Sequence, residues 1–292
     1  MPVHENLPPP SPPDFKPPDS LTRFAGLVAD HTEMPLAEAA LEIGRVEDPD
    51  FDHDMAQGRL DDLREMVRAA DPGESADPVR RLESLRHVLA EDAGFSGHPQ
   101  ELGRPAASCL HLVLQRQTGL PILLSILYME MARSIGLPLK GIGLPGRFIV
   151  RLDGVLPPVF ADPFDQGIFL DEGGCAALLD EISGGNLQMQ PEYMHPWSKR
   201  RIIWRLLNNL KVAYVEAQDL RRARQVVDHQ ITLQPAAPEP WRDRGLLAYR
   251  SLLFGQAVGD LETYLEMAPR AEDGAAIRLQ LKSLRRLIGS MN

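Results

Sequence analysis

The sequence predicts an α+β protein, in which a helical domain with a small antiparallel sheet precedes an all-helical domain. Apolar residues recur at helical spacing between residues 20 and 135, for example at Leu82, Leu85 and Leu89. The period changes to that of a strand at residues 148–152 and again at 159–161. The spacing becomes helical again for the rest of the chain. Helices followed by strands that pair with one another are typical of an α+β layout.

The chain has 292 residues, which is long enough for two domains. We expect a domain at residues 20–195 and a second one at 196–292. Residues 1–19 carry eight prolines, and proline cannot join the interior of a helix or a sheet. We therefore expect a disordered tail at 1–19, and a ligand for a polyproline-binding domain is the alternative.

Composition and charge restrict the class of protein. Hydrophobic residues make up 43% and charged residues 25%, which is typical of a soluble globular protein. The net charge of −10 argues against general binding to nucleic acid or an acidic membrane, because phosphate attracts a basic surface. Two cysteines favour a reducing compartment. Without a signal peptide or an apolar run of membrane-spanning length, we expect a cytoplasmic protein that binds no cofactor and no metal.

An acidic run at residues 48–54 separates two amphipathic helical stretches. It contains four aspartates and His53, a composition that suits a metal site. It lacks the glycine and the distant glutamate of a calcium-binding loop. A turn that caps the next helix therefore explains the run better.

Residues 123–135 form the predicted central helix, because they are apolar nearly all round. Gly136 and Pro138 end it, since glycine tolerates the left-handed conformation and proline blocks continuation. Gly141, Gly143 and Gly146 follow in a G-x-G-x-x-G pattern. A dinucleotide site needs a strand before this pattern and a helix after it. The order here is the reverse, so we expect a tight helix-to-strand connection.

The second domain contains an internal repeat. Pro235 and Pro269 follow similar helical pairs, and their separation matches the tetratricopeptide period of about 34 residues. At this spacing, large residues pair with large ones and small residues with small ones, whereas Lys211 stands opposite Gly245. The matched pairs are Leu207 with Trp241, Ala223 with Ala257, and Val227 with Leu261. Two repeats and a capping helix at 273–288 are therefore predicted, with an ordinary helical bundle as the alternative.

Cysteine and histidine offer candidate chemistry. Cys109 and His111 are close in sequence and suggest a nucleophile with its base. Residues two apart on a helix point in different directions, however, so a buried packing role is the alternative. Cys175 stands at the start of a predicted helix, where the helix N-terminus would lower the pKa of its thiol.

Several segments resemble the SirB family, whose transglutaminase-like, papain-like domain is followed by tetratricopeptide repeats. The resemblance covers residues 35–180 and the repeats. The matching segments are Gly94-Phe-Ser-Gly97, Val113-Leu-Gln-Arg116, Gly119-Leu-Pro-Ile-Leu-Leu-Ser125, Ala132-Arg-Ser-Ile-Gly-Leu-Pro138, Pro145-Gly-Arg-Phe148 and Asp162-Pro-Phe164.

This resemblance implies where a catalytic triad would stand. The nucleophilic cysteine of active relatives would fall at Pro121, which is also the residue typical of the SirB family. The base histidine would fall at Arg147, and the third member matches Asp162. A proline side chain has no nucleophilic atom, and an arginine stays protonated, so it cannot accept a proton as a base. The resemblance therefore implies that the chain keeps the fold of these enzymes but lacks their nucleophile and their base. Arg147 and Asp162 are expected to pair across strands, or Arg147 to bind a carboxylate ligand.

The repeat domain provides a candidate binding surface. Positions that line the concave groove of such repeats fall on Arg205, Asn208, Arg242, Tyr249 and Arg250. Three arginines favour an acidic peptide or a chain-terminal carboxylate, and a solvated, partly salt-bridged helix face is the alternative. The leading hypothesis is a non-catalytic interaction or regulatory protein that binds a protein or peptide partner. The alternative is a thiol-dependent hydrolase or acyltransferase using Cys109.

Overall fold

The computed structural model describes residues 18, 21–30 and 34–291, and it divides the chain into two compact units. Asp30–Asn209 forms one of them, which we call the first unit. The described residues up to Ala29 form the other together with those from Leu210 onward, and we call it the repeat unit. The tail predicted at 1–19 lies outside the described residues except for Pro18. The division falls at residue 209 rather than 195, and each unit is described by itself.

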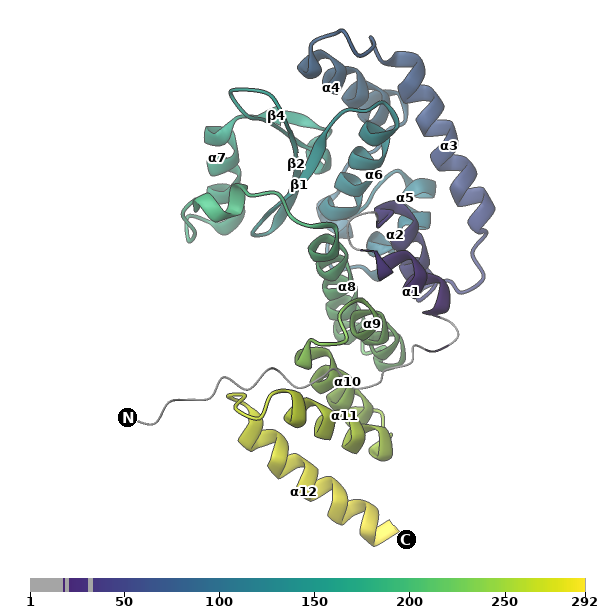
Figure 1. The fold of residues 1–292 in the computed structure, drawn as a ribbon, viewed down its shortest axis with the longest axis vertical. Coiled ribbons are helices and arrows are strands. Elements are labelled where there is room, and N and C mark those ends of the chain that lie inside the picture. The colour runs from purple at the N-terminus through teal and green to yellow at the C-terminus, as the bar shows by residue number, and fades with distance from the viewer. Residues whose placement is uncertain (1–17, 19–20, 31–33, 292) are drawn as a thin grey trace. The chain divides into compact units, whose positions relative to one another are not determined.

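The first unit contains helices and one sheet (Figure 1). A π-helical turn at His87–Asp92 and short 3-10 turns at Pro99–Glu101, Pro105–Ser108, Pro163–Asp165 and Pro191–Met194 connect them. The elements are α2 (Leu36–Gly44), α3 (His53–Ala70), α4 (Pro78–Arg86), α5 (Leu110–Arg116), α6 (Pro121–Ser134), β1 (Leu139–Leu144), β2 (Arg147–Leu152), β3 (Val159–Asp162), β4 (Ile168–Leu170) and α7 (Glu172–Ser183).

The acidic run at 48–54 forms a turn and caps α3, as the sequence predicts. The Asp52 carboxylate accepts the Met55 amide at 2.9 Å, and the Asp48 carboxylate accepts the Asp50 amide at 3.2 Å. A side-chain oxygen at this position satisfies an amide that the first turn of a helix leaves without a partner. Within the described ranges, no group of three or more His, Cys, Asp and Glu side chains is arranged to hold a metal ion.

Helix α6 is the centre of the first unit. Pro121 occupies its first turn, where proline is favoured because that amide has no partner within the helix. Nearly all of the α6 side chains are buried, and the helix packs against α2, α3, α4, α5, β1 and β2. This confirms the central helix that the apolar sequence predicts.

The sheet has the order β1-β2-β3-β4, and all of its pairs are antiparallel. Strands β2 and β3 confirm the two predicted strands. The connection predicted at Gly141 and Gly143 is wrong, because both residues lie in β1 and only Gly146 lies in the turn to β2. A Cβ atom at Gly143 would lie 2.2 Å from the Trp197 ring. These glycines therefore serve close packing over a strand, and a strand follows where a dinucleotide site needs a helix.

Helix α7 covers the face of the sheet opposite α6 (Figure 1). Ile142, Leu144, Ile149 and Phe160 point to this side and form one buried cluster with Cys175 of α7. The other face of the sheet meets α6, where Phe148 and Val150 are fully buried. The sheet is thus a middle layer, and β2 alternates its side chains between the two sides.

The repeat unit confirms the predicted repeat period. It holds α1 (Thr22–Ala29), α9 (Leu220–Leu233), α10 (Pro238–Arg250), α11 (Phe254–Met267) and α12 (Gly274–Met291), and the division from the first unit falls inside α8 (Lys199–Glu216). Helix α9 begins and ends one repeat period before α11, and α8 ends one period before α10. Ala223, Ala257, Val227 and Leu261 are fully buried, as the predicted helix crossings require.

Two further features complete the repeat unit. Lys211, which departs from the small-residue position of the first repeat, forms an ion pair with Asp243 at 2.6 Å. Phe24 of α1 packs edge-on against His229 of α9, with ring centroids 4.9 Å apart. The sequence predicts residues 20–29 as part of the first domain, whereas α1 clusters with the repeats. No helix within the described part of the chain has the length and apolarity to cross a bilayer.

Gly245 is required where α10 crosses α11, because a Cβ atom there would lie 2.8 Å from Leu261 Cγ. We expect Gly245→Val to lower the free energy of unfolding by about 1–3 kcal/mol through overpacking. Gly259→Val is the matched control, since nothing lies within 4 Å of that position in α11. The control should change stability by less than about 0.5 kcal/mol. Urea unfolding followed by far-UV circular dichroism measures both, and equal effects would contradict the close crossing.

Candidate functional site

The first triad position holds no reactive atom. Pro121 is buried in the first turn of α6, and the amide of the preceding Leu120 donates to the Ala107 carbonyl at 3.0 Å. Proline offers neither a nucleophile nor a backbone donor. In the structure Pro121 thus begins α6.

The other two triad positions form an ion pair. Arg147 Nε lies 3.3 Å from Asp162 Oδ2, and the Asp162 carboxylate is 1% exposed. The two atoms are not aligned for a hydrogen bond, so the attraction is one of charge. The guanidinium also lies over the Phe164 ring at 4.3 Å, a favourable cation–π contact. Arg147 and Asp162 therefore pair between adjacent strands, as the sequence predicts.

Asp162 is also engaged on its other oxygen. Its Oδ1 accepts the Phe164 amide at 3.0 Å, which caps the 3-10 turn Pro163–Asp165. Burial raises the pKa of the Asp162 carboxyl above its ordinary value, although Arg147 and the Phe164 amide act in the opposite direction. Both carboxylate oxygens thus hold local structure.

A buried phenol borders this pair. Tyr128 of α6 is fully buried, and its hydroxyl has no hydrogen-bond partner in the described part of the chain. Burial raises the pKa of the Tyr128 hydroxyl strongly, and the Asp162 charge adds to this effect. A Cβ atom at Gly167 would lie 2.6 Å from the hydroxyl oxygen. Tyr128 is a residue near the triad positions that the sequence analysis did not select, because an aromatic side chain on an apolar helix indicates a core residue.

Two of the motifs that carry the family resemblance meet beside the pair. The Gly97 amide donates to the Phe164 carbonyl at 2.8 Å. A Cβ atom at Gly97 would lie 2.0 Å from the Phe164 ring. Only glycine leaves room for this ring, and the ring in turn supports the Arg147 guanidinium. The motifs of residues 94–97 and 162–164 therefore build one packed corner.

Cys109 and His111 are not arranged as a nucleophile and its base. Cys109 is fully buried, and its Sγ donates to the Pro105 carbonyl at 3.4 Å. His111 is 1% exposed and stacks on the Phe51 ring at 4.3 Å. Neither ring nitrogen of His111 has a hydrogen-bond partner among the described residues. Burial lowers the pKa of the imidazole, so the neutral ring is favoured in the folded protein.

Cys175 differs from the expectation of an activated thiol. It lies in the first turn of α7 but is fully buried in the cluster beneath the sheet. Burial raises its pKa to about 12, and the nearby Asp171 charge adds to the effect. Loss of hydration therefore outweighs the helix N-terminus at this thiol.

Arg205 has a structural role in the first unit. Its guanidinium donates to the Leu144 carbonyl at 3.1 Å and to the Arg147 carbonyl at 3.2 Å, at the turn between β1 and β2. It also lies near the rings of Phe148 and Trp197. Burial lowers its pKa. Arg205 thus holds the hairpin that carries Arg147.

The remaining predicted binding residues differ in their exposure and in their partners within the chain. Asn208 and Tyr249 are exposed. Arg250 is exposed and donates to the Gln218 side chain at 3.0 Å. Arg242 pairs with Asp273 at 3.0 Å and with Asp243 at 3.1 Å. Asn208 belongs to the first unit and the other three to the repeat unit.

The sequence analysis assigned no site to α12, where the structure shows a basic groove. A hollow of about 830 Å³ lies between α11 and α12. Four cations of α12 contribute to its lining, namely Arg278, Lys282, Arg285 and Arg286. Their recurrence at spacings of three and four residues, typical of one face of a helix, is the signal that the sequence offers for this groove.

Comparison with known families agrees with this architecture. The family described as the Transglutaminase-like superfamily matches residues 54–208, more than half of the chain. The chain belongs to the transglutaminase-like superfamily. A tetratricopeptide repeat family matches residues 210–282. The order of the two domains that the sequence predicts is thereby confirmed for this superfamily member.

Relatives of similar length share both parts. The UPF0162 protein of Xylella fastidiosa (strain Temecula1) is 32% identical over 261 residues, which cover 87% of this chain and 92% of that protein. The UPF0162 protein of Pseudomonas aeruginosa is 31% identical over 250 residues, 84% and 88% of the two chains. A crystal structure of menin aligns with a TM-score of 0.33 at 12% identity, covering 85% of this chain and 69% of that one, a likeness too low to bear on fold or function.

Removing Arg147 should leave Asp162 as a buried charge. We expect Arg147→Met to cost about 3 kcal/mol at pH 8, since breaking a buried pair is strongly destabilising. Burial already raises the pKa of Asp162 in the wild type, and loss of the arginine raises it further in the variant. The loss of stability therefore grows as the pH rises through the pKa of Asp162 in the folded variant, and it is smaller at pH 5. Arg147→Met/Asp162→Asn should recover more than half of the loss. Arg104→Met, at an arginine that is 64% exposed, is the control and should cost less than about 1 kcal/mol.

His111 should make the fold sensitive to acid. Its pKa is lowered by burial, so the unfolded state takes up a proton first as the pH falls below about 6.5. Stability is therefore complete above that pH and declines below it. His111→Phe should remove this part of the decline in urea titrations between pH 7.5 and 5.5. His195→Phe, at an exposed histidine, should retain the decline, and identical profiles for the two variants would refute this role of His111.

Proposed function

We propose that this protein is a non-catalytic interaction or regulatory protein of the SirB type, acting in the cytoplasm. Its transglutaminase-like domain is a pseudoenzyme, coupled to a repeat module that binds a protein or peptide partner. The observation that carries the proposal is the ion pair of Arg147 with Asp162, 3.3 Å apart, at two of the three triad positions.

Each triad role fails for a chemical reason. Pro121 has no atom that attacks a carbonyl carbon. An arginine side chain offers only hydrogen-bond donors, so the residue at position 147 cannot act as the base. Asp162 cannot orient an imidazole, because Arg147 and the Phe164 amide engage its two oxygens. Arg147 and Asp162 thus stabilise the corner of the sheet instead of taking part in a reaction.

The alternative function is a thiol-dependent hydrolase or acyltransferase using Cys109. It requires a thiolate that a substrate reaches and a base within hydrogen-bond distance. Cys109 is fully buried, and the ring nitrogens of His111 make no hydrogen bond within the described residues. The burial of both side chains favours a packing role for the pair.

The partner is proposed to be a protein, because tetratricopeptide repeats form extended surfaces for other chains. Asn208, Tyr249 and Arg250 are exposed and remain candidates for this contact. Arg205 and Arg242 also belonged to the predicted set, but their engagement within the chain favours structural roles. The net charge of −10 supports an interaction with protein rather than nucleic acid.

The pH dependence of thiol alkylation tests the loss of catalysis. Iodoacetamide labelling of the folded protein, read by mass spectrometry, should be slow at Cys109 and at Cys175 because both are fully buried. Both should react readily in urea. Cys175 is the internal reference, since its pKa is raised to about 12.

The competing enzyme gives a different result in the same experiment. Rapid labelling of folded Cys109, with an apparent pKa below the roughly 8.5 of a free thiol, would overturn the proposal. Slow labelling of both cysteines that becomes fast on unfolding supports it. Cys109→Ala provides the matched control, because only the Cys175 signal then remains.

A further inference from the structure

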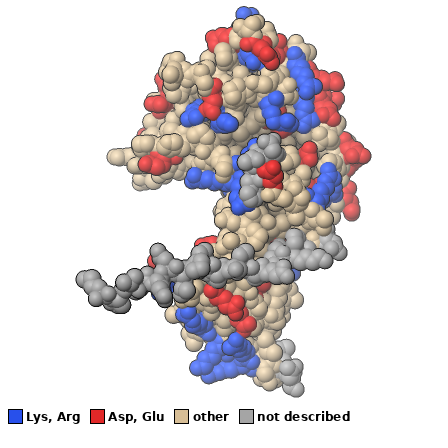
Figure 2. All heavy atoms as spheres, viewed as in Figure 1, with Lys and Arg blue, Asp and Glu red and all other residues tan. Residues whose placement is uncertain are grey.

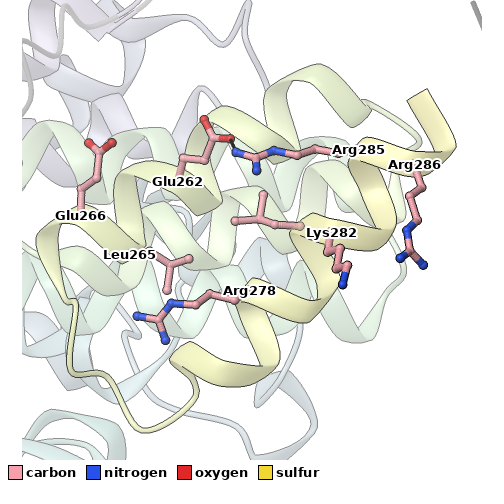
Figure 3. Close-up of a pocket in the computed structure, with 8 residues that line it drawn as sticks. Glu262, Leu265, Glu266, Arg278, Lys282, Arg285 and Arg286 are labelled. Carbon is pink, nitrogen blue, oxygen red and sulfur yellow. Dashed lines mark hydrogen bonds and ion pairs between the residues drawn. The ribbon is translucent and has the colours of Figure 1, made fainter. Parts of the chain in front are cut away.

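The basic groove of the repeat unit is formed by two antiparallel helices (Figure 3). Glu262, Leu265 and Glu266 line it from α11. Arg278, Leu281, Lys282, Arg285 and Arg286 line it from α12. Figure 2 shows Lys and Arg side chains gathered at the end of the repeat unit where Figure 1 draws α12. The groove thus combines an excess of positive charge with two leucines, in a chain whose net charge is −10.

The charges of the groove are only partly compensated. Arg285 reaches across to Glu262 at 2.5 Å (Figure 3), and Arg278 donates to the Pro269 carbonyl at 3.0 Å. Lys282 and Arg286 line the groove from α12 (Figure 3). Both are exposed, and neither forms an ion pair within the described residues. Lys282 and Arg286 are therefore available to bind an anionic partner.

The floor of the groove is apolar. Leu281 is 5% exposed, and Leu265 is half-buried on the facing helix. Leu281 is largely covered within the chain, whereas Leu265 leaves part of its surface accessible in the groove. Apolar contact contributes free energy in proportion to the area removed from water, so a ligand with an apolar side chain among its acidic ones fits better than a bare polyanion.

We propose that the groove between α11 and α12 binds an acidic peptide segment of a partner protein, with Lys282 and Arg286 as its principal anion contacts. Along α12, Arg278 and Arg286 are eight residues apart, which is about 12 Å at 1.5 Å per residue. An extended peptide covers that length with about four residues. The inference rests on the proposed interaction function and names the partner chemistry of this surface.

Fluorescence anisotropy with a defined probe tests the site on the full chain. The probe is a fluorescein-labelled nine-residue peptide that alternates two glutamates with one leucine, and its neutral counterpart carries glutamine for glutamate. We expect Lys282→Glu/Arg286→Glu to weaken binding of the acidic probe about tenfold or more, because two attractions become repulsions. Raising the salt concentration should weaken wild-type binding as well.

Arg80→Glu/Arg221→Glu is the matched control. Both arginines are exposed, and the change in net charge is the same, but they lie on α4 and α9 outside the groove. The control should bind the probe like the wild type. Thermal unfolding by circular dichroism checks that both variants fold, and Lys282→Gln/Arg286→Gln serves as a milder pair if the reversal does not fold.

Several outcomes would overturn the inference. These are equal binding by the groove variant and the control, equal binding of the neutral peptide, and absence of binding by the wild type. Tighter binding of oligothymidylate or phosphatidylserine vesicles through Lys282 and Arg286 would assign the groove to nucleic acid or membrane. Self-association lost in the groove variant, measured by sedimentation, would assign it to a second copy. None of these results alters the thiol labelling, so failure of the groove and failure of the proposed function are distinguishable.

Discussion

The burial of α6 is the constraint on which the first unit depends. A helix that is apolar nearly all round cannot lie at a surface, so helices must cover one side of it and a sheet the other. Two of its polar side chains have partners on other elements: Ser125 donates to the Phe148 carbonyl at 3.0 Å, and Glu130 meets Arg64 at 2.9 Å. The Ser125 bond joins α6 to β2 one residue after Arg147, which fixes the strand that carries the arginine.

Arg147 and Asp162 form a structural element at positions where the family resemblance implies a triad. A buried carboxylate is costly unless a cation or donors compensate it. In an enzyme of this superfamily, a histidine at the Arg147 position would leave that compensation dependent on its protonation state. Arginine provides a permanent charge, and its contact with Phe164 draws the 3-10 turn against the strand. Arg147 is thus a fixed partner for Asp162.

The sequence predicted the features that depend on local spacing. The period of α6, the two strands at residues 148–152 and 159–161, and the tetratricopeptide period follow from patterns within a single element or between equivalent positions. Strand β1 was not predicted, because Gly141 and Gly143 are typical of a loop. Both positions need glycine because the side chains of Trp197, Phe148 and Ile202 pack closely over them. The roles of the arginines were not predicted either, because their partners are distant in the sequence. Arg205 meets carbonyls about sixty residues away in the chain, and Arg242 meets Asp273.

The arginines of the repeat unit show why a count of cations does not locate a binding surface. Arg244 of α10 is held between Asp228 and Asp260, each at 2.7 Å, and Arg242 lies between Asp243 and Asp273. Charges compensated in this way attract a ligand only weakly, and removing Arg244 would leave the buried carboxylate of Asp260 without its cation. Lys282 and Arg286 have no such partner within the described residues and lie beside an apolar floor. A cation is available for recognition where its own chain leaves it exposed and uncompensated, and in this repeat unit that condition holds at Lys282 and Arg286 but not at Arg242 or Arg244.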